Sequence, residues 1–354
     1  MSSLRACFRT LVACAVLWCC VSPAIAGVRR HDRDDTLHTS LANHSPYAAV
    51  GQVTLVNDDG VTVGLGSGTH IGDGWILTAA HVVDNLAPGD FIVGPYGAGS
   101  GQSISAGDIY QADASEVHVH TGWNSDNLLG GNDVAVFRLS GDYSSLAVAE
   151  LAPVGVNPVG RPATAVGYGR TGVGSEGHNP QPPDPSVPNA PGTKRAGTNM
   201  IDLRGGQVGP EQNGGVYLNA SSVATSILLS DFDNPGNTNA SLLGEQTPLY
   251  LEYSIAPGDS GGALMIVDPS DPQNQLLAGI HSFVASVQAE TDDERIIGDV
   301  NEFVDSSYGE LQGYTEVSPF IADFIYPNTG IPEPATMVLL VSMGGLLLRR
   351  RASR

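Results

Sequence analysis

The sequence predicts an all-β protein, because of its low charge, its abundance of turn residues and the spacing of its apolar runs. Of 354 residues, 44 are glycine and 23 are proline, and only 15% are charged. Helical bundles and coiled coils carry more charge, whereas β-proteins use glycine and proline in their turns. Apolar residues make up 41% of the chain, which excludes disorder throughout, and the length allows one large or two smaller domains.

The body of the chain reads as two blocks of short strands. Asn57-Asp58-Asp59-Gly60 and Gly72-Asp73-Gly74 are typical hairpin turns in the first block. A second β-rich block runs from 163 to 314, and its glycine- and proline-rich segment 172–197 is expected to be an exposed loop. The first block predicts strands over residues 50–56, 61–71, 75–78, 117–120 and 134–139.

One amphipathic helix is expected at the end of the body, over residues 318–326. Ser318 can cap its N-terminus with Pro319 at the first helical position, and Pro327 is expected to end it. Residues 327–331 are then a linker. The apolar residues with helical spacing are Val317, Phe320, Ile321, Phe324 and Ile325.

Residues 1–26 have the pattern of a secretory signal peptide. Arg5 and Arg9 precede an apolar run from Leu11 to Val21, and Ala24-Ile25-Ala26 is a small-residue cleavage site. The run is too short to be a membrane anchor. All four cysteines lie within this peptide, so the exported chain has no disulfide. Residues 27–45 then form an N-terminal segment or a short propeptide.

The C-terminal 332–354 segment has three parts in order: Pro332-Glu333-Pro334, an apolar stretch over 335–348, and an arginine cluster. As a helix the stretch spans about 21 Å, marginal for a bilayer. The segment resembles the PEP-CTERM sorting signal of Gram-negative bacteria, with an ordinary tail anchor as the alternative. The resemblance implies transient anchoring by a transmembrane helix over 335–348, sorting by an exosortase-type membrane enzyme, and a place in the cell envelope, at the cell surface or in the extracellular matrix.

The charge distribution argues against nucleic-acid binding. The formal net charge is −21, and most of the basic residues lie near the two ends. Residues 34–331 hold 7 basic residues against 35 acidic ones, a net of −28. A body of that charge repels phosphate backbones.

Three short motifs carry the residue types of nucleophilic catalysis. Leu77-Thr-Ala-Ala-His81 ends a strand, Asp133-Val-Ala-Val begins one, and Gly258-Asp-Ser260-Gly-Gly is a glycine-rich loop. A serine becomes a nucleophile when a base takes its proton and a third group orients that base. Glycines beside the serine let backbone N–H groups converge on one point, as an oxyanion hole requires.

Together these motifs resemble the trypsin/chymotrypsin family of serine peptidases over residues 46–326, in the same His, Asp, Ser order. The resemblance implies two six-stranded antiparallel β-barrels, about 46–155 and 156–315, with a short C-terminal helix. It also implies His81, Asp133 and Ser260 as the catalytic triad, with the N–H groups of Gly258 and Ser260 as the oxyanion hole. No cofactor or metal is expected, and the protein is expected to be monomeric and to cleave polypeptides.

The resemblance places the primary specificity pocket at five residues. Trypsin-like enzymes have an aspartate at its floor, where this chain has serine, so cleavage after Lys and Arg should be poor. Small or medium apolar P1 residues are favoured. Glutamate is the alternative, because glutamate-specific relatives carry a histidine in this wall. The pocket residues are Ser254 at the floor and His281, Ser282, Phe283 and Val284 in the wall, with Ser282 also implied to support the buried aspartate.

Two departures leave alternatives open. Family members pair a new N-terminal amine with the aspartate that precedes the serine, here Asp259, yet no typical start follows the leader. Either a cut near Arg29–Arg33 supplies an unusual terminus or Asp259 has another partner. Residues 231–239 hold the early ligands and glycine of a calcium loop but lack its final glutamate, so metal binding there is not expected.

The leading functional hypothesis is an exported serine endopeptidase. The alternative is an inactive trypsin-like domain that binds a partner at the cell surface or in the extracellular matrix. The intact set of three motifs favours the enzyme.

Overall fold

The computed structural model describes most of the body and little of the two ends. For residues 7–10, 62, 91–95, 109–113 and 216–218 it describes the backbone alone. The predicted cleavage site at 24–26 and the whole of the C-terminal signal, 332–354, lie outside the described residues. These are 7–10, 27–57, 59, 62–86, 91–95, 109–113, 116–178, 193–209, 216–237, 241–244, 247–286, 300–301 and 303–331.

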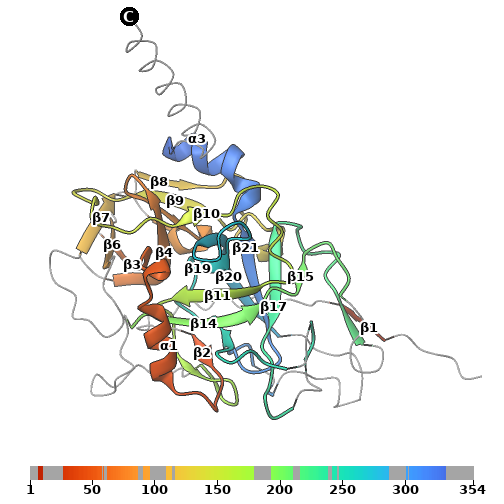
Figure 1. Ribbon diagram of the computed structural model, residues 1–354. Coiled ribbons are helices and arrows are strands. Elements are labelled where there is room, and N and C mark those ends of the chain that lie inside the picture. The colour runs from red at the N-terminus through yellow and green to blue at the C-terminus, as the bar shows by residue number, and fades with distance from the viewer. Residues whose placement is uncertain are drawn as a thin grey trace, which may run out of the picture.

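The first main sheet is curled and antiparallel, with strand order β7-β6-β3-β4-β5-β9-β8 (Figure 1). Two strands begin and end where the sequence predicts, and the other three do so within one residue. The hairpin turn at 72–74 has positive φ at all three positions, which suits its two glycines. The strands are β3 Val50–Val56, β4 Thr62–Gly72, β5 Trp75–Thr78, β6 Phe91–Pro95, β7 Ile109–Asp113, β8 Val117–Val119 and β9 Ala135–Arg138.

The second main sheet has the order β14-β11-β19-β20-β21-β17-β15, and β10 pairs with β20. The all-β prediction is therefore confirmed. In the described residues the main sheets hold seven and eight strands rather than six each, and the short strands β10 and β15 account for the two additional strands of the second sheet. The strands are β10 Glu150–Leu151, β11 Pro162–Gly167, β14 Arg195–Met200, β15 Leu203–Arg204, β17 Ile227–Asp231, β19 Ala263–Val267, β20 Gln275–Ala285 and β21 Leu311–Glu316.

Two smaller sheets complete the topology. The first has the order β13-β12-β2-β18, and it joins β2 near the N-terminus to β18 just before the serine motif. The second is a parallel pair of β1 and β16, which lies at the side of the body in Figure 1. The strands are β1 Cys7–Thr10, β2 Val28–Arg29, β12 Gly172–Val173, β13 Gly177–His178, β16 Val216–Asn219 and β18 Tyr253–Ser254.

The exposed-loop prediction for 172–197 is wrong at both ends. Residues 172–173 and 177–178 form the hairpin β12–β13, and residues 194–196 are buried at the start of β14. Arg195 is buried because its guanidinium makes a two-point ion pair with Asp35, at 2.7 Å for each bond. This contact joins β14 to helix α1 (Asp35–Ala42), which lies beside that strand in Figure 1. Residues 179–192 lie outside the described part of the chain.

The C-terminal helix packs its predicted apolar stripe into the same hydrophobic core as the first sheet. Its backbone is a 3₁₀ turn over Ser318–Phe320, a π turn over Ile321–Ile325 and α3 (Tyr326–Thr329). Ser318 does not cap it. Pro327 does not end it either, because proline is tolerated in the first turn of α3, and the helix ends at Gly330 in the left-handed conformation.

Within the described residues, no helix is both long enough and apolar enough to cross a membrane. The stretch 335–348, for which a transmembrane helix is predicted, is outside them.

Candidate active site

His81 and Asp133 meet because their strands are paired. β5 and β9 run antiparallel with Thr78 opposite Ala135, so the end of one strand lies beside the start of the other. The short helix α2 (Ala80–Val83) follows β5 and carries His81. Its Nδ1 lies 2.7 Å from Asp133 Oδ2, and its backbone N–H donates to Oδ1 at 2.9 Å. The carboxylate therefore holds the ring with Nδ1 protonated and Nε2 free to accept a proton.

A β-bulge in β20 brings Ser282 to the same carboxylate. The register of β20 with β21 shifts between His281 and Phe283, so Ser282 is the extra residue. Its Oγ donates to Asp133 Oδ2 at 2.5 Å. Bulges of this kind re-aim a side chain next to a site. The fully buried Asp133 thus accepts three hydrogen bonds, two from His81 and one from the second sheet.

The electrostatics of His81 suit a general base. Burial of the ring lowers its pKa, but the charge and hydrogen bond of Asp133, with a smaller contribution from Asp84, outweigh this and raise the pKa above the ordinary value of imidazole. Asp84 is held in place by Trp123, whose Nε1 donates to it at 2.8 Å.

Ser260 lies on a loop that packs against β4, the strand that pairs with β5. Its carbonyl accepts from Ser67 N at 2.8 Å. Gly66 lies between this loop and α2: a Cβ there would be 2.7 Å from Val82 Cγ1 and 3.2 Å from the Ser260 carbonyl oxygen. The structure therefore brings the nucleophile motif next to the residue that follows His81.

The N–H groups of Gly258 and Ser260, the predicted oxyanion hole, belong to peptide bonds whose carbonyls, on Pro257 and Asp259, are held by hydrogen bonds. Pro257 O accepts from Arg170 N at 2.8 Å, and Asp259 O accepts from Gly262 N at 2.8 Å. In a trans peptide the N–H points opposite to the C=O, so the N–H groups of Gly258 and Ser260 face away from these anchors. Neither has an acceptor among the described residues, as an oxyanion hole requires.

Comparison with known proteins agrees with this geometry. The sequence model of the Trypsin family matches residues 41–203, a range that includes His81 and Asp133 and ends before Ser260. The chain is 32% identical over 138 residues to proproteinase E of Bos taurus and 31% identical over 111 residues to chymotrypsin-like elastase family member 1 of Macaca fascicularis. These alignments cover 36% and 29% of this chain, and the chain spans about half the length of these relatives or less, 52% and 39%.

Over residues 41–203 this chain is therefore similar in sequence to the Trypsin family. A solved structure titled as HL collagenase shares its fold, with a TM-score of 0.52 and 18% identity over 87% of this chain and 100% of that one.

The predicted pocket floor, Ser254, is fully buried, and Gln312 of β21 binds the backbone on both sides of it. The Gln312 amide brackets the serine: Oε1 accepts from Ile255 N at 3.1 Å, and Nε2 donates to Tyr253 O at 3.2 Å. Tyr314 OH donates to the same Oε1 at 2.7 Å. Among the described residues, the groups around Ser254 are thus uncharged and hydrogen-bonded.

His281 is fully buried in the predicted wall, and burial lowers its pKa to about 4, so the ring is neutral at physiological pH. Its Nδ1 lies 3.1 Å from the Asp259 carbonyl, which accepts the Nδ1 proton and leaves Nε2 as an acceptor. A neutral ring in this tautomer offers no donor to a glutamate side chain. Phe283 lies over the backbone of Gly313, and the partly buried Val284 pairs with Gln312 across the strands.

In the described part of 231–239, the Asp231 carboxylate binds two backbone amides. The carboxylate accepts from Leu242 N at 2.6 Å and from Leu243 N at 2.9 Å. Among the described residues, no group of three His, Asp or Glu side chains is placed to hold an ion. Residues 238 and 239 lie outside them.

The sequence analysis did not identify two residues that support the serine loop and the predicted pocket, Ser67 and Gln312. Ser67 Oγ donates to Gly258 O at 3.0 Å and accepts from Tyr168 N at 3.0 Å, which ties the serine loop to both sheets. The small residues on both sides of Ser67 in β4 are the sequence feature that could have predicted the close approach of β4 to the serine loop. Gln312 has a weaker signal, a polar residue in an otherwise buried strand.

Proposed function

We propose that this protein is a serine endopeptidase that hydrolyses peptide bonds through an acyl-enzyme intermediate. The observation that carries the proposal is the buried Asp133 carboxylate, which orients His81 beside the loop of Ser260. An arrangement of this kind activates a serine hydroxyl, which favours the enzyme over the inactive-domain alternative.

Acylation follows from the placement of these groups. Ser260 Oγ attacks the substrate carbonyl carbon while His81 Nε2 takes its proton, and Asp133 stabilises the imidazolium. The carbonyl oxygen becomes an oxyanion that the N–H groups of Gly258 and Ser260 bind. His81 then donates the proton to the leaving nitrogen, and the C–N bond breaks. Water deacylates the serine by the same route in reverse.

The pocket favours small or medium apolar P1 residues. A lysine or arginine would bury its charge against Ser254 and Gln312, where the described part of the chain offers no carboxylate to pair it. Glutamate, the alternative, is disfavoured by the neutral His281 and by the net negative body.

We further propose that the protein is exported from a Gram-negative cell and sorted at the envelope by its C-terminal segment. Support comes from the order of sequence parts in residues 1–26 and 332–354. Its partners would be polypeptide substrates and an exosortase-type enzyme, and we expect a monomer.

Labelling with a fluorophosphonate probe tests the assembled Ser-His pair directly. Wild type should label and cleave casein, whereas Ser260→Ala should do neither, and His81→Ala should lose activity by several powers of ten. Ser270→Ala, an exposed serine in the turn after β19, is the matched control and should behave as wild type. Wild-type protein that neither labels nor cleaves, even when its chain begins at Gly27, would contradict the proposal.

A further inference from the structure

Ser67 of β4 is fully buried, and each of its polar groups is hydrogen-bonded to another part of the site. Its backbone N–H donates to the Ser260 carbonyl and its own carbonyl accepts from Thr78 Oγ1, both at 2.8 Å. Its hydroxyl donates to the Gly258 carbonyl at 3.0 Å and accepts from Tyr168 N at 3.0 Å. One side chain thus connects the first sheet, the serine loop and the residue that follows β11 in the second sheet.

The direction of the Ser67 hydroxyl proton is fixed by these two partners. A serine hydroxyl has one proton to donate and accepts through its lone pairs. The backbone N–H of Tyr168 can only donate, and the carbonyl of Gly258 can only accept, so the proton points to the carbonyl. The Gly258 carbonyl is therefore the group that this hydroxyl holds in place.

The peptide carbonyls of residues 257, 258 and 259 are held by different kinds of donor. The first and the third accept from backbone amides. The middle carbonyl, that of Gly258, accepts from the Ser67 side chain. Gly258 has φ +95°, a conformation that favours glycine, and glycine leaves the backbone more free than any other residue does. The bond from Ser67 therefore fixes the peptide plane at the position where the loop has the greatest intrinsic freedom.

This middle peptide plane lies between the two N–H groups of the predicted oxyanion hole. The N–H of Gly258 precedes it along the chain, and the N–H of Ser260 follows it. A peptide plane is rigid and turns only about the backbone bonds of the Cα atoms on either side. Those Cα atoms, of Gly258 and Asp259, also carry the two planes that contain the N–H groups. If the middle plane turned, the two N–H groups would no longer converge on one point.

The carboxylate of Asp259 anchors the same loop through a separate set of bonds. Oδ2 accepts from Gly27 N and Ala256 N, both at 2.9 Å, and Oδ1 accepts from Gly169 N at 2.8 Å. These bonds hold a side chain, whereas Ser67 holds the backbone beside it. Loss of the Ser67 hydroxyl should therefore loosen one peptide plane while the loop stays attached to the fold.

We propose that the Ser67 hydroxyl positions the oxyanion hole by fixing the peptide plane between Gly258 and Asp259. The inference rests on the proposed function. Ser67 is a positioning residue, because it acts through the backbone of the serine loop. The oxyanion develops only as the reaction proceeds, so donors that are already in place raise kcat and change KM little.

The first test is the kinetics of Ser67→Ala in the full mature chain, with a fluorogenic peptide that has a small apolar P1 residue. We expect kcat to fall about tenfold and KM to stay within about twofold of wild type. A fall in kcat of less than about threefold, or a change confined to KM, would overturn the inference and leave the proposed function intact. A wild-type chain without turnover would instead contradict the proposed function.

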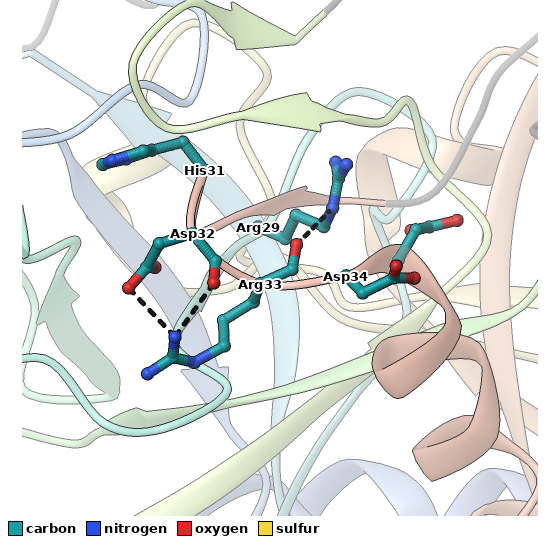
Figure 2. Close-up of a pocket in the computed structure, with 6 residues that line it drawn as sticks. Arg29, His31, Asp32, Arg33 and Asp34 are labelled. Atoms are coloured by element: carbon teal, nitrogen blue, oxygen red, sulfur yellow. Dashed lines mark hydrogen bonds and ion pairs between the residues drawn. The ribbon is translucent and has the colours of Figure 1, made fainter.

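Two control variants separate positioning from a loss of stability. Thr69→Val removes another buried hydroxyl of β4, one that has no partner among the described residues. Asp34→Ala removes the N-cap of α1, where Oδ1 accepts from Thr36 N at 2.8 Å; Figure 2 shows Asp34 at the start of that helix. Asp34→Ala should lower Tm, and both controls should keep the wild-type kcat well below Tm. An equal loss of kcat in Asp34→Ala would assign the effect of Ser67→Ala to stability.

A transition-state analogue measures the oxyanion hole directly. Ser260 Oγ adds to the carbonyl carbon of a peptidyl trifluoromethyl ketone, the hydroxyl proton passes to His81, and the former carbonyl oxygen becomes a hemiketal oxygen in the hole. With carbon-13 at that carbon, NMR measures the pKa of the hemiketal hydroxyl. Ser67→Ala should raise this pKa by about one unit, which corresponds to a tenfold weaker stabilisation of the anion. An unchanged pKa would refute the positioning role even if kcat falls.

Ser67→Cys is the second variant, for use where Ser67→Ala does not fold at the assay temperature. The thiol fills similar space, and its S–H is a weak donor. The same direction of change is expected in kcat and in the hemiketal pKa. Wild-type values of both in folded Ser67→Cys would overturn the inference.

Discussion

Ser282 and Asp133 join the two main sheets through a single hydrogen bond, from Oγ to Oδ2 at 2.5 Å. Asp133 precedes β9 of the first sheet, and Ser282 belongs to β20 of the second. The oxygen that accepts from Ser282 is also the one that binds His81 Nδ1. The orientation of the predicted base therefore depends on how the two sheets are docked.

Ser282→Ala should weaken catalysis and raise the pKa of His81. Without the hydroxyl, Oδ2 keeps more negative charge and favours the imidazolium, while the ring loses part of its alignment. We expect kcat/KM to fall about tenfold, or about 1.4 kcal/mol, and its acid limb to move to higher pH. Ser282→Thr, which keeps a hydroxyl, is the control. If the acid limb of the kcat/KM profile of Ser282→Ala lay at the same pH as that of wild type, the role given to the Ser282–Asp133 hydrogen bond would be contradicted.

The wild-type pH profile should rise at a pH above the ordinary pKa of histidine. The base acts in its neutral form, and Asp133 and Asp84 outweigh the effect of burial to raise the pKa of His81. Activity should therefore be lost as pH falls through this raised value. The measurement is kcat/KM against pH at constant ionic strength. A rate that stays flat from acid to neutral pH, with chemistry limiting, would exclude His81 as the base.

The uncharged groups around Ser254 predict which P1 residues the enzyme prefers. On a P1-varied fluorogenic panel at moderate salt, small and medium apolar residues should be preferred over Lys, Arg and Glu. If Lys or Arg were preferred about tenfold in kcat/KM, the pocket assignment would be wrong.

Gln312→Ala should shift that preference toward larger apolar P1 residues, because it empties the base of the pocket. It also leaves Ile255 N and Tyr253 O without their partner, so a stability cost of about 1–3 kcal/mol is expected. Gln207→Ala, at an exposed position in a turn outside the pocket, is the control for the panel. An unchanged P1 profile in folded Gln312→Ala would show that this residue does not bound the pocket.

Lys194 should make stability depend on pH. Burial lowers its pKa from 10.5 to about 7, and its Nζ donates to the Tyr47 carbonyl. Between those two values the unfolded chain binds the extra proton, so the free energy of unfolding should rise with pH by up to about 1.4 kcal/mol per unit. Lys194→Met should remove this slope in urea unfolding, whereas Arg138→Met, at an exposed cation, should keep it. Parallel slopes in wild type and Lys194→Met would contradict the assignment.

The C-terminal segment 332–354 should be absent from the mature protein where an exosortase is present. Intact mass of the exported chain measures this, with a variant lacking Pro332-Glu333-Pro334 as the control that retains its tail. An exported wild-type chain that still ends at Arg354 would contradict the sorting prediction.

Local patterns predicted the local structure well. Strands 50–56 and 75–78 have the expected ends because apolar residues and turn glycines mark both. The apolar stripe of the C-terminal helix is buried as predicted, but its cap is not, because Val317 already has helical backbone angles ahead of Ser318.

Long-range contacts were beyond sequence reasoning. Lys194 and Arg195 look like surface residues, and only their distant partners Tyr47 and Asp35 explain their burial. Gln312 likewise has no pattern that reveals its bonds around Ser254. Family resemblance supplied the roles of the triad, and the contact of Gly27 with Asp259 joins residues 232 positions apart that no local pattern connects.

The place of β2 between β12 and β18 has a consequence for the order in which the molecule is made. In a chain that crosses a membrane N-terminus first, β2 emerges long before its neighbours, and its pairing with β18 must wait until Tyr253–Ser254 has followed. Contacts of such high sequence separation form late in folding. If the protein is an exported peptidase, as proposed, its predicted pocket floor would lack this support until most of the chain is outside, and the export machinery would not meet an active enzyme.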